Sequence, residues 1–286
     1  MSASSAITSV SSEPGIGLNH DTPELAAAYD RTSLYQFETG KQLVSGLNIL
    51  DGERVLDIGA GTGHLAAYVA KIVGPSGWVV GVDPLPLRIE MAQSKASGNF
   101  EARVGRAEDL SQFADASFDV VYLNSVFHWV EDKPRALAEV LRVLKAGGRL
   151  GLNCSRDAAR PSEARLFTRR ALVEAGVELD HHIAQPSLGL ASEVAGEELE
   201  AMVVAAGFVA YSSEFRTFVD HFSDVDALIT WASSSSFGNF FVNVSAANRA
   251  AVRDALACLL EPKRTPQGIL LERYFTFATA RKPKTD

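Results

Sequence analysis

The sequence predicts an α/β protein built on a doubly wound, mostly parallel sheet of seven strands with an antiparallel edge. Two observations predict this fold class. Between residues 54 and 153, short apolar runs alternate with helical stretches, which is typical of successive right-handed βαβ units. The apolar runs are hydrophobic along their whole length, as strands are when helices cover both faces of a parallel sheet.

Five predicted strands and the helices around them form the core of this sheet. The strands are Arg54–Ile58, Trp78–Val82, Phe100–Val104, Phe118–Leu123 and Arg149–Asn153. The helices between them are His64–Val73, Leu85–Ser97 and Pro134–Leu144. One helix over Thr22–Leu50 precedes the sheet, since Thr22 can cap its start and Asp51-Gly52 breaks the helical spacing.

The regular alternation of strands and helices ends after Asn153. Helices are expected at Pro161–Gly176 and Gly196–Ala206, and two longer strands with partial alternation at Phe208–Phe222 and Arg273–Ala280. Such strands suit an antiparallel pair at one sheet edge. Residues 223–268 lie between them and include a helix near Ala246–Leu260, so we interpret them as a helical and aromatic insertion, lid-like, within the same domain.

Composition and charge limit the classes of function that the chain can have. The chain has 286 residues, is 47% hydrophobic and 22% charged, and carries a net charge of −8. This acidic balance argues against DNA or RNA as a partner, because binding them needs basic groups that neutralise phosphates. The longest apolar run, Ala201–Tyr211, is far short of the roughly 17–25 residues of a membrane helix. Cys154 and Cys258 make neither a disulfide framework nor a zinc site, and we expect no metal.

The first 20 residues are rich in serine and contain neither Lys or Arg nor the apolar segment of a signal peptide. We therefore expect residues 1–20 to be a disordered tail, residues 21–286 to be one domain, and the protein to be cytoplasmic, as a monomer or homodimer.

A glycine loop follows the first predicted strand. Gly59, Gly61 and Gly63 follow the pattern G-x-G-x-G, whereas a dinucleotide fingerprint reads G-x-G-x-x-G. Asp57 ends the strand just before this loop, where a carboxylate repels a pyrophosphate and attracts a cation. Asp83 ends the next strand, where a carboxylate can accept the hydroxyls of a ribose. The electrostatics favour S-adenosylmethionine (SAM), which carries an ammonium group and no phosphate, over NAD or ATP.

With these features the chain resembles the class I SAM-dependent methyltransferases, which have a Rossmann-like sheet, over about Tyr29 to Leu152. Within them it is most similar to the small-molecule group that includes the trans-aconitate and the ubiquinone/menaquinone methyltransferases. The motifs that carry the resemblance are Val55–Gly63, Val80–Asp83, Gly105–Leu110, Phe118–Val121 and Arg142–Gly148.

The resemblance implies a role for individual residues. Gly59, Gly61 and Gly63 would pack the methionine part of SAM, Asp57 would help place its ammonium, and Asp83, followed by Pro84, would hold the ribose. The further implied cofactor contacts are Arg106, Ala107 and Glu108 at the adenine, Asn124 beneath the methionine, and Tyr29 and Gln36 above the site. Arg106 departs from the Asp or Asn usual in the family, and Ala146 replaces a common proline.

Methyl transfer from a sulfonium is an in-line displacement with a neutral leaving group, so the enzyme mainly has to align the reactants. The candidate general base is His128, which follows the fourth strand. The alternative, that His128 packs or caps a turn, is favoured. His64, which opens the helix after the glycine loop, is a further cofactor-contact candidate.

Substrate contacts are sought in the insertion. Trp231, Phe237, Phe240 and Phe241 lie within 11 residues and form either a wall over the cofactor or the insertion's own core. Arg156, with Arg160, could face a substrate carboxylate. The sequence therefore predicts a SAM-dependent methyltransferase that acts on O, N or S of a small organic molecule. The alternatives are a non-catalytic SAM-binding sensor or complex subunit and, opposed by the loop spacing, a nicotinamide-dependent oxidoreductase.

Overall fold

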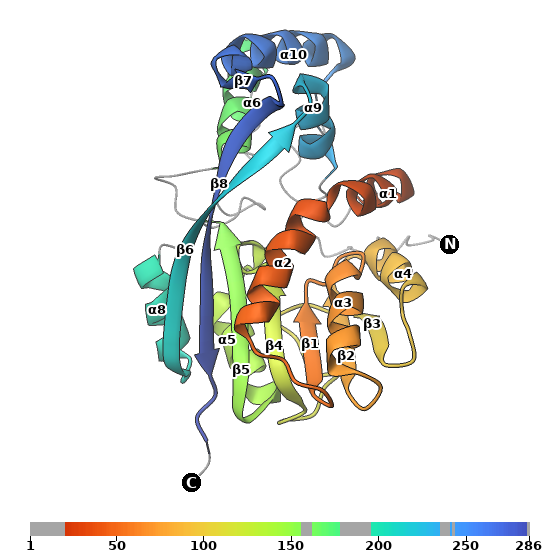
Figure 1. Ribbon diagram of the computed structural model, residues 1–286, viewed down its shortest axis with the longest axis vertical. Helices are drawn as coiled ribbons and strands as arrows, with labels where there is room; N and C mark the ends of the chain where they lie inside the picture. The colour runs from red at the N-terminus through yellow and green to blue at the C-terminus, as the bar shows by residue number, and fades with distance from the viewer. Residues whose placement is uncertain (1–20, 156–161, 178–195, 235–240, 242–243, 285–286) are drawn as a thin grey trace, which may run out of the picture.

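The computed structural model describes residues 21–155, 162–177, 196–234, 241 and 244–284, and has a mostly parallel sheet at its centre (Figure 1). The strand order is β3-β2-β1-β4-β5-β8-β6, and the two-residue strand β7 pairs with β8. Strands β1 to β5 are parallel to their neighbours, whereas β8 is antiparallel to both β5 and β6. The predicted seven-stranded sheet with an antiparallel edge is confirmed, with β7 in addition. The strand bounds are β1 Arg54–Ile58, β2 Trp78–Asp83, β3 Phe100–Val104, β4 Phe118–Asn124, β5 Leu144–Ser155, β6 Val209–Phe222, β7 Arg264–Thr265 and β8 Gly268–Arg281.

Helices cover both faces of the sheet. Residues of α2, α3 and α4 pack with Val55 and Val79 on one face. Residues of α5 and α8 pack with Leu56 and Val80 on the other, because successive strand residues point to opposite faces. The helix bounds are α1 Pro23–Thr32, α2 Leu34–Gly46, α3 His64–Val73, α4 Pro86–Ser94, α5 Lys133–Val143, α6 Glu163–Glu174, α8 Gly196–Ala205, α9 Val225–Ser233 and α10 Ala246–Leu260, with 3-10 turns η2 Phe127–Trp129 and η3 Glu261–Lys263.

The predicted helix over Thr22–Leu50 is two helices, α1 and α2, which meet at Ser33. Thr22 caps α1 as expected, since its Oγ1 accepts a hydrogen bond from the Leu25 N–H at 3.2 Å. At the break, the hydroxyls of Thr32 and Ser33 donate to main-chain carbonyls of the preceding turn, at 3.0 and 3.3 Å. Such side-chain bonds to the backbone compete with regular helix and explain why the spacing of apolar residues alone did not locate the break.

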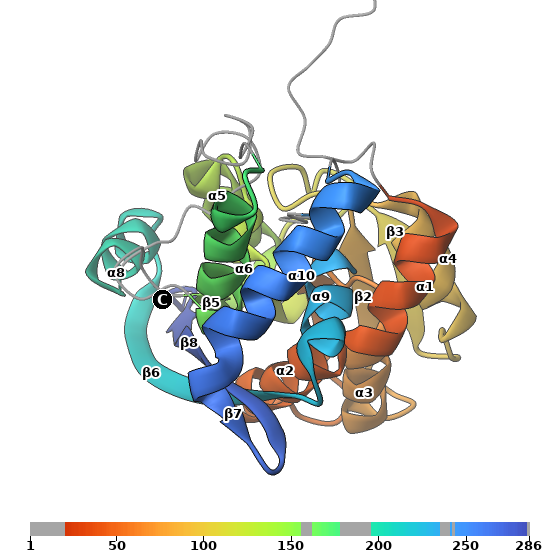
Figure 2. The same ribbon diagram turned by 90° about the horizontal axis from the view of Figure 1, so that it is seen from above.

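Strands β6 and β8 carry a second, smaller core. Each has 14 residues, and together they extend past the end of the parallel sheet (Figure 1). Helices α6, α9 and α10 and strand β7 lie on this extension, and we call them the cap. Seen from above, the three cap helices lie together over the end of the sheet (Figure 2). Their apolar side chains form one buried cluster with Phe222, Ile269 and Leu271 of the long strands.

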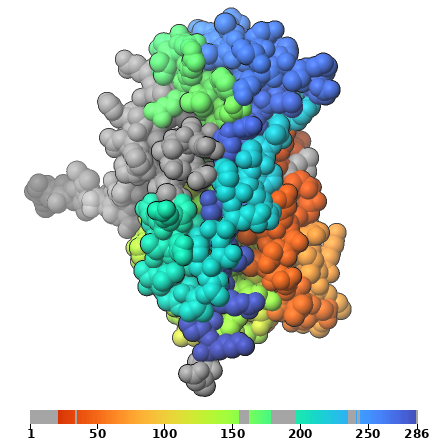
Figure 3. All heavy atoms as spheres, turned by 60° about the vertical axis from the view of Figure 1, so that its left-hand side comes forward, coloured from red at the N-terminus to blue at the C-terminus, as the bar shows by residue number. Residues whose placement is uncertain are grey.

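The predicted insertion 223–268 thus contains most of the cap, but not all of it. Helix α6 precedes the insertion by about 50 residues in sequence and packs against α10, at the same end of the molecule (Figure 3). Of the helices in the described ranges, none has the length and apolar character that crossing a membrane requires.

Candidate active site

A pocket lies between the carboxyl ends of the parallel strands and the cap. Its sheet half is formed by residues of α1, α2, the glycine loop and the segments after β2, β3 and β4. Its cap half is formed by residues of α6, α9 and β8, and η2 lies between the two halves. The predicted site residues that line it are Tyr29, Gln36, Gly59, Gly61, Asp83, Pro84, Arg106, Ala107, Glu108, Asn124, His128 and Trp231.

The glycine loop turns from β1 into α3 through three residues with positive φ. Gly59, Gly61 and Gly63 have φ angles of 76°, 54° and 83°. A Cβ at Gly59 would lie 2.1 Å from Val126 Cγ2, and one at Gly63 would lie 2.8 Å from Ala92 Cβ. Gly59 and Gly61 line the pocket, whereas Gly63 does not. Gly63 therefore allows α3 to pack against α4, and the expected contact between Gly63 and a cofactor stays a prediction.

Asp83 holds the glycine loop and faces the pocket. Its Oδ2 accepts a hydrogen bond from the Gly61 N–H at 2.9 Å, and its Oδ1 accepts one from the Leu85 N–H at 3.0 Å. Burial raises the pKa of this carboxyl to about 6, although the two backbone hydrogen bonds lower it. Each carboxylate oxygen has a second lone pair, so Asp83 can still accept hydrogen bonds from a ligand.

Asp57 lies beneath the glycine loop and not in the main pocket. It lines a smaller adjoining pocket, and the residues common to both pockets are Tyr29, Gln36, Gly59, Gly61 and Asn124. The hydroxyl of Tyr122, its neighbour on β4, donates to Asp57 Oδ2 at 2.8 Å. Burial, with the charge of Asp83, raises the pKa of Asp57 to about 7 against the effect of this hydrogen bond.

Three neighbouring elements meet at Asn124. Its Nδ2 donates to the Gln36 carbonyl at 2.9 Å, and its Oδ1 accepts from Asn153 Nδ2 at 2.8 Å. Asn153 Oδ1 accepts in turn from the N–H of Ser125, a left-handed residue with φ 60°. The side-chain atoms Gln36 Oε1 and Ser125 Oγ of two residues in this network are buried and have no hydrogen-bond partner among the described residues. Because buried polar atoms are nearly always paired, both are suited to contact a ligand.

Helix α1 covers the glycine loop. The ring of Tyr29 lies against Gly61, and the Arg88 guanidinium carbon is 4.2 Å from the centre of this ring. Arg88 is itself buried and paired with Asp21 at 2.9 Å. His64 Nε2 lies 2.8 Å from Asp30 Oδ1 of α1. His64, expected as a cofactor contact, therefore links the start of α3 to α1. Of the two pockets, it lines the smaller one.

The segment after β3 brings Gly105, Arg106, Ala107 and Glu108 to the pocket. Arg106 lies 3.7 Å from both Glu108 and Glu131, so its charge is balanced by carboxylates. Glu108 Oε1 accepts a hydrogen bond from the Glu131 N–H at 3.0 Å.

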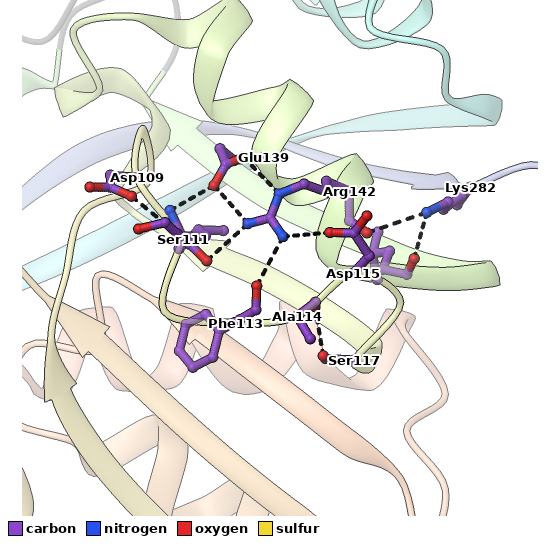
Figure 4. Close-up of polar contacts among 11 residues, drawn as sticks. Asp109, Ser111, Phe113, Ala114, Asp115, Ser117, Glu139, Arg142 and Lys282 are labelled. Atoms are coloured by element: carbon purple, nitrogen blue, oxygen red, sulfur yellow. Dashed lines mark hydrogen bonds and ion pairs between the residues drawn. The ribbon is translucent and has the colours of Figure 1, made fainter.

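Arg142 of α5 anchors the rest of this loop, as Figure 4 shows. Its guanidinium donates to the carbonyls of Leu110 and Phe113, each at 2.9 Å, and to Asp115 Oδ1 at 2.8 Å. Glu139 accepts from Arg142 at 2.8 and 2.9 Å and from the Leu110 N–H at 2.8 Å. One side chain therefore ties a loop of the pocket wall to α5.

Replacing Arg142 with leucine should lower the melting temperature by about 5 °C, since charge-assisted hydrogen bonds contribute a net 1.5–3 kcal/mol each and part of this network is exposed to water. Hydrogen exchange should rise over residues 105–117. Arg170→Leu, which removes one exposed ion pair with Glu174, serves as the control and should change neither quantity. Equal effects of the two substitutions would remove Arg142 from this role.

His128 lies in η2 and is 6% exposed. Burial and the positive charges of Arg165 and Lys133 lower its pKa to about 3. The imidazole is therefore neutral near pH 7 and a weak base. This environment argues against the role of general base and favours the alternative that His128 packs in its turn.

The aromatic residues of the insertion have different environments. Trp231 lines the cap half and contacts Phe222 with ring centres 5.7 Å apart. Phe241 is 1% exposed and belongs to the core of the cap, so its assignment to a pocket wall is corrected. Phe237, Phe240, Arg156 and Arg160 lie outside the described residues.

Sequence reasoning missed much of the cap half. The structure adds Trp129, Arg165, Arg273 and Phe275 to the pocket, as well as Ser125 in the sheet half. Ser125 and Trp129 are next to the predicted site residues Asn124 and His128. Their position after the end of a strand could have indicated that they reach the pocket. Arg165 and the β8 residues reach the pocket through tertiary packing, which no local sequence pattern predicts. The described residues contain no group of His, Cys, Asp and Glu suited to a metal ion.

Comparison with known proteins decides the family of the central segment. Residues 56–152 match the family model described as a methyltransferase domain. The matched segment makes up about a third of the chain. The predicted resemblance is thereby confirmed for this segment.

Curated relatives carry methyltransferase names. The chain is 34% identical over 154 residues to the malonyl-[acyl-carrier protein] O-methyltransferase of Methylococcus capsulatus, covering 49% of this chain and 55% of the relative. It is 39% identical over 104 residues to the ubiquinone/menaquinone biosynthesis C-methyltransferase of Vibrio campbellii, covering 35% and 40%. The chain spans about a third to a half of the length of the curated relatives it matches.

Solved structures share the fold. The YcgJ protein of Bacillus subtilis superposes with a TM-score of 0.58 at 22% identity, covering 87% of this chain and 99% of that one. A protein of Bacillus halodurans described as a putative methyltransferase gives a TM-score of 0.56 at 21% identity, covering 86% and 99%.

Proposed function

We propose that this protein is a SAM-dependent methyltransferase that transfers a methyl group to an O, N or S atom of a small organic molecule. The observation that carries the proposal is the hydrogen bond from the Gly61 N–H to Asp83. In dinucleotide sites, glycine-loop amides face the pyrophosphate. Here one of these amides, the Gly61 N–H, already donates to the Asp83 carboxylate, and Asp57 lies directly below the loop. Two carboxylates favour the cationic, phosphate-free cofactor.

The sheet half of the pocket fits this cofactor. Asp83 would accept the ribose hydroxyls, next to Pro84, and residues Gly105–Glu108 would border the adenine. Gln36 Oε1 and Ser125 Oγ, two of the buried atoms without a hydrogen-bond partner among the described residues, would face the methionine end with Asn124. Asp57 would stabilise the ammonium through its charge. A Cβ at Gly59 would collide with Val126, so glycine is needed for the loop to pack there.

SAM would supply a methyl group on a positively charged sulfur that leaves as a neutral thioether. The work of the chain is then to hold the acceptor in line and to exclude water, which can supply about 7–11 kcal/mol in favourable cases. Trp129, Trp231 and Phe275 give the pocket apolar walls for this purpose. The neutral His128 would accept a hydrogen bond from the acceptor and orient it.

Arsenic is not the acceptor that this chain suits, although two curated relatives are named arsenite methyltransferases. Trivalent arsenic is a soft centre that prefers thiolate ligands. Cys154 is fully buried, and burial raises its pKa to about 12, whereas Cys258 is exposed and lies on α10. The two thiols line neither described pocket. An organic acceptor is therefore proposed.

Calorimetry with SAM, S-adenosylhomocysteine and NAD tests the proposal. We expect micromolar binding of SAM and S-adenosylhomocysteine and no binding of NAD. Binding of NAD without SAM would establish the oxidoreductase alternative. SAM binding with no methylated product across a broad metabolite panel, followed by mass spectrometry, would favour a non-catalytic sensor.

A further inference from the structure

A buried ion pair lies in the wall of the cap half. Arg273 of β8 stands opposite Phe218 of β6, two residues before Asp220, so Arg273 and Asp220 are diagonal neighbours on one face of the two strands. Nε and Nη2 of Arg273 donate to the two carboxylate oxygens of Asp220, at 2.8 and 3.0 Å. Arg273 is 8% exposed and Asp220 is 2% exposed. Because a buried ion pair is often less stabilising than apolar side chains of the same volume, stability alone does not account for this pair.

Aromatic rings and Asp220 together hold the Arg273 guanidinium in one orientation. Its carbon lies 5.8 Å from the ring centre of Tyr35, 5.6 Å from that of Phe218 and 4.9 Å from that of Phe275. The bonds to Asp220 use Nε and Nη2, and Nη1 makes no hydrogen bond to another described residue. Arg273 lines the pocket, so a ligand there can accept a hydrogen bond from Nη1. A guanidinium stays protonated in proteins and has no acceptor atom, so Nη1 can only donate.

The charge of Arg273 is already balanced where it meets the pocket. An anionic group would have to leave water for a pair whose net charge is zero, and burying a charge without a counter-charge is costly. An uncharged oxygen loses less hydration and still gains a charge-assisted hydrogen bond from the guanidinium. Two other arginines of the pocket wall, Arg88 and Arg106, are also paired with carboxylates. The Asp220–Arg273 pair therefore favours a neutral hydrogen-bond acceptor.

We infer that Arg273 donates from Nη1 to an uncharged carbonyl or hydroxyl oxygen of the methyl acceptor, and that Asp220 makes this site select against anionic acceptors. The inference rests on the proposed function. Trp231 and Phe275 line the same half of the pocket, so the acceptor is an uncharged, largely apolar molecule that carries such an oxygen. Arg273 is an acceptor-binding residue, and Asp220 acts through it.

Three planar probes of similar shape and different charge test the inference on the full chain saturated with S-adenosylhomocysteine. They are the neutral benzamide, the anion benzoate and the cation benzamidine, titrated by NMR at neutral pH. We expect benzamide to bind about tenfold more tightly than either charged probe. Benzoate that binds as tightly as benzamide, or more tightly, would overturn the inference.

Asp220→Asn should reverse the preference. Asparagine keeps an oxygen that accepts from Arg273 but removes the balancing charge, so the affinity for benzoate should rise about tenfold while that for benzamide stays within about twofold. Asp226→Asn is the matched control, because Asp226 pairs with Arg253 at 2.7 Å in the same cap but both side chains are more than half exposed. It should leave the order of the three probes unchanged. The same unchanged order in folded Asp220→Asn protein would contradict the role of Asp220.

The wild-type protein provides a second readout, which does not depend on the folding of a variant. The guanidinium nitrogen resonances of Arg273 should shift when benzamide binds, and resonances that stay in place would remove Arg273 from the acceptor site. Failure of the protein to bind S-adenosylhomocysteine would contradict the proposed function instead. The same titrations on the free protein would still decide whether Arg273 selects uncharged ligands.

Discussion

Replacing Asp83 with alanine should raise the dissociation constant for SAM at least tenfold, a loss of about 1.4 kcal/mol or more. The carboxylate would accept the ribose hydroxyls, and it also fixes the glycine loop through the Gly61 N–H. Alanine removes both interactions and leaves two buried amides unpaired, which adds to the cost. Calorimetry on the variant, with circular dichroism to establish that it is folded, measures the effect.

Asp119→Ala provides the control for this prediction. Asp119 also accepts a backbone hydrogen bond, from the Arg54 N–H at 2.9 Å, but it lies near the start of β4 at the opposite end of the sheet. Its loss should leave the affinity for SAM unchanged. If folded Asp83→Ala protein bound SAM as tightly as the wild type, Asp83 would not be part of the cofactor site.

The affinity for SAM should rise about tenfold between pH 6 and pH 8. In the cofactor-free protein, burial raises the pKa of Asp57 to about 7 from its ordinary value of 3.8, so this carboxyl is mostly protonated at pH 6. The cationic cofactor favours the ionised carboxylate, and binding therefore releases a proton below pH 7. Asp57→Asn should flatten the pH dependence, and Tyr122→Phe should move it to higher pH because Tyr122 stabilises the ionised form.

The same carboxyl groups give the free protein an opposite pH trend. Asp57 and Asp83 hold protons in the folded chain that the unfolded chain has lost, so their contribution to stability is fully present below about pH 4 and disappears as the pH rises to about 7. Melting temperatures with and without S-adenosylhomocysteine should diverge as the pH increases. A constant difference between pH 5 and pH 8 would show that ionisation of Asp57 is not linked to cofactor binding.

The parallel part of the sheet was predictable because its signals are local. Strands that are buried along almost their whole length, such as Arg54–Ile58, alternate with helices at short spacing, and few topologies are compatible with this pattern. Gly59 and Asp83 could be placed for the same reason, since each follows a strand end within one βαβ unit.

Residues whose role depends on distant partners could not be placed. Asp57 was expected to face the crevice and lines the smaller pocket, but no local pattern indicated that the register of β1 with β4 pairs it with Tyr122, 65 positions along the chain. Arg165 stands in a helix that sequence reasoning kept apart from the insertion. The length of β6 and β8 carries α9 and α10 to α6, and that contact brings Arg165 to the pocket. Phe241 and Trp231 share one sequence cluster, yet packing sends the first into the core and the second to the pocket wall.

A crystal structure of the protein with S-adenosylhomocysteine tests the central claim most directly. The proposal predicts the ligand in the sheet half of the pocket, with ribose hydroxyls on Asp83, adenine beside Gly105–Glu108 and the sulfur directed toward the cap half. Adenosine bound elsewhere with this pocket left vacant, or a pocket that accepts a diphosphate-bridged nucleotide in its place, would contradict it.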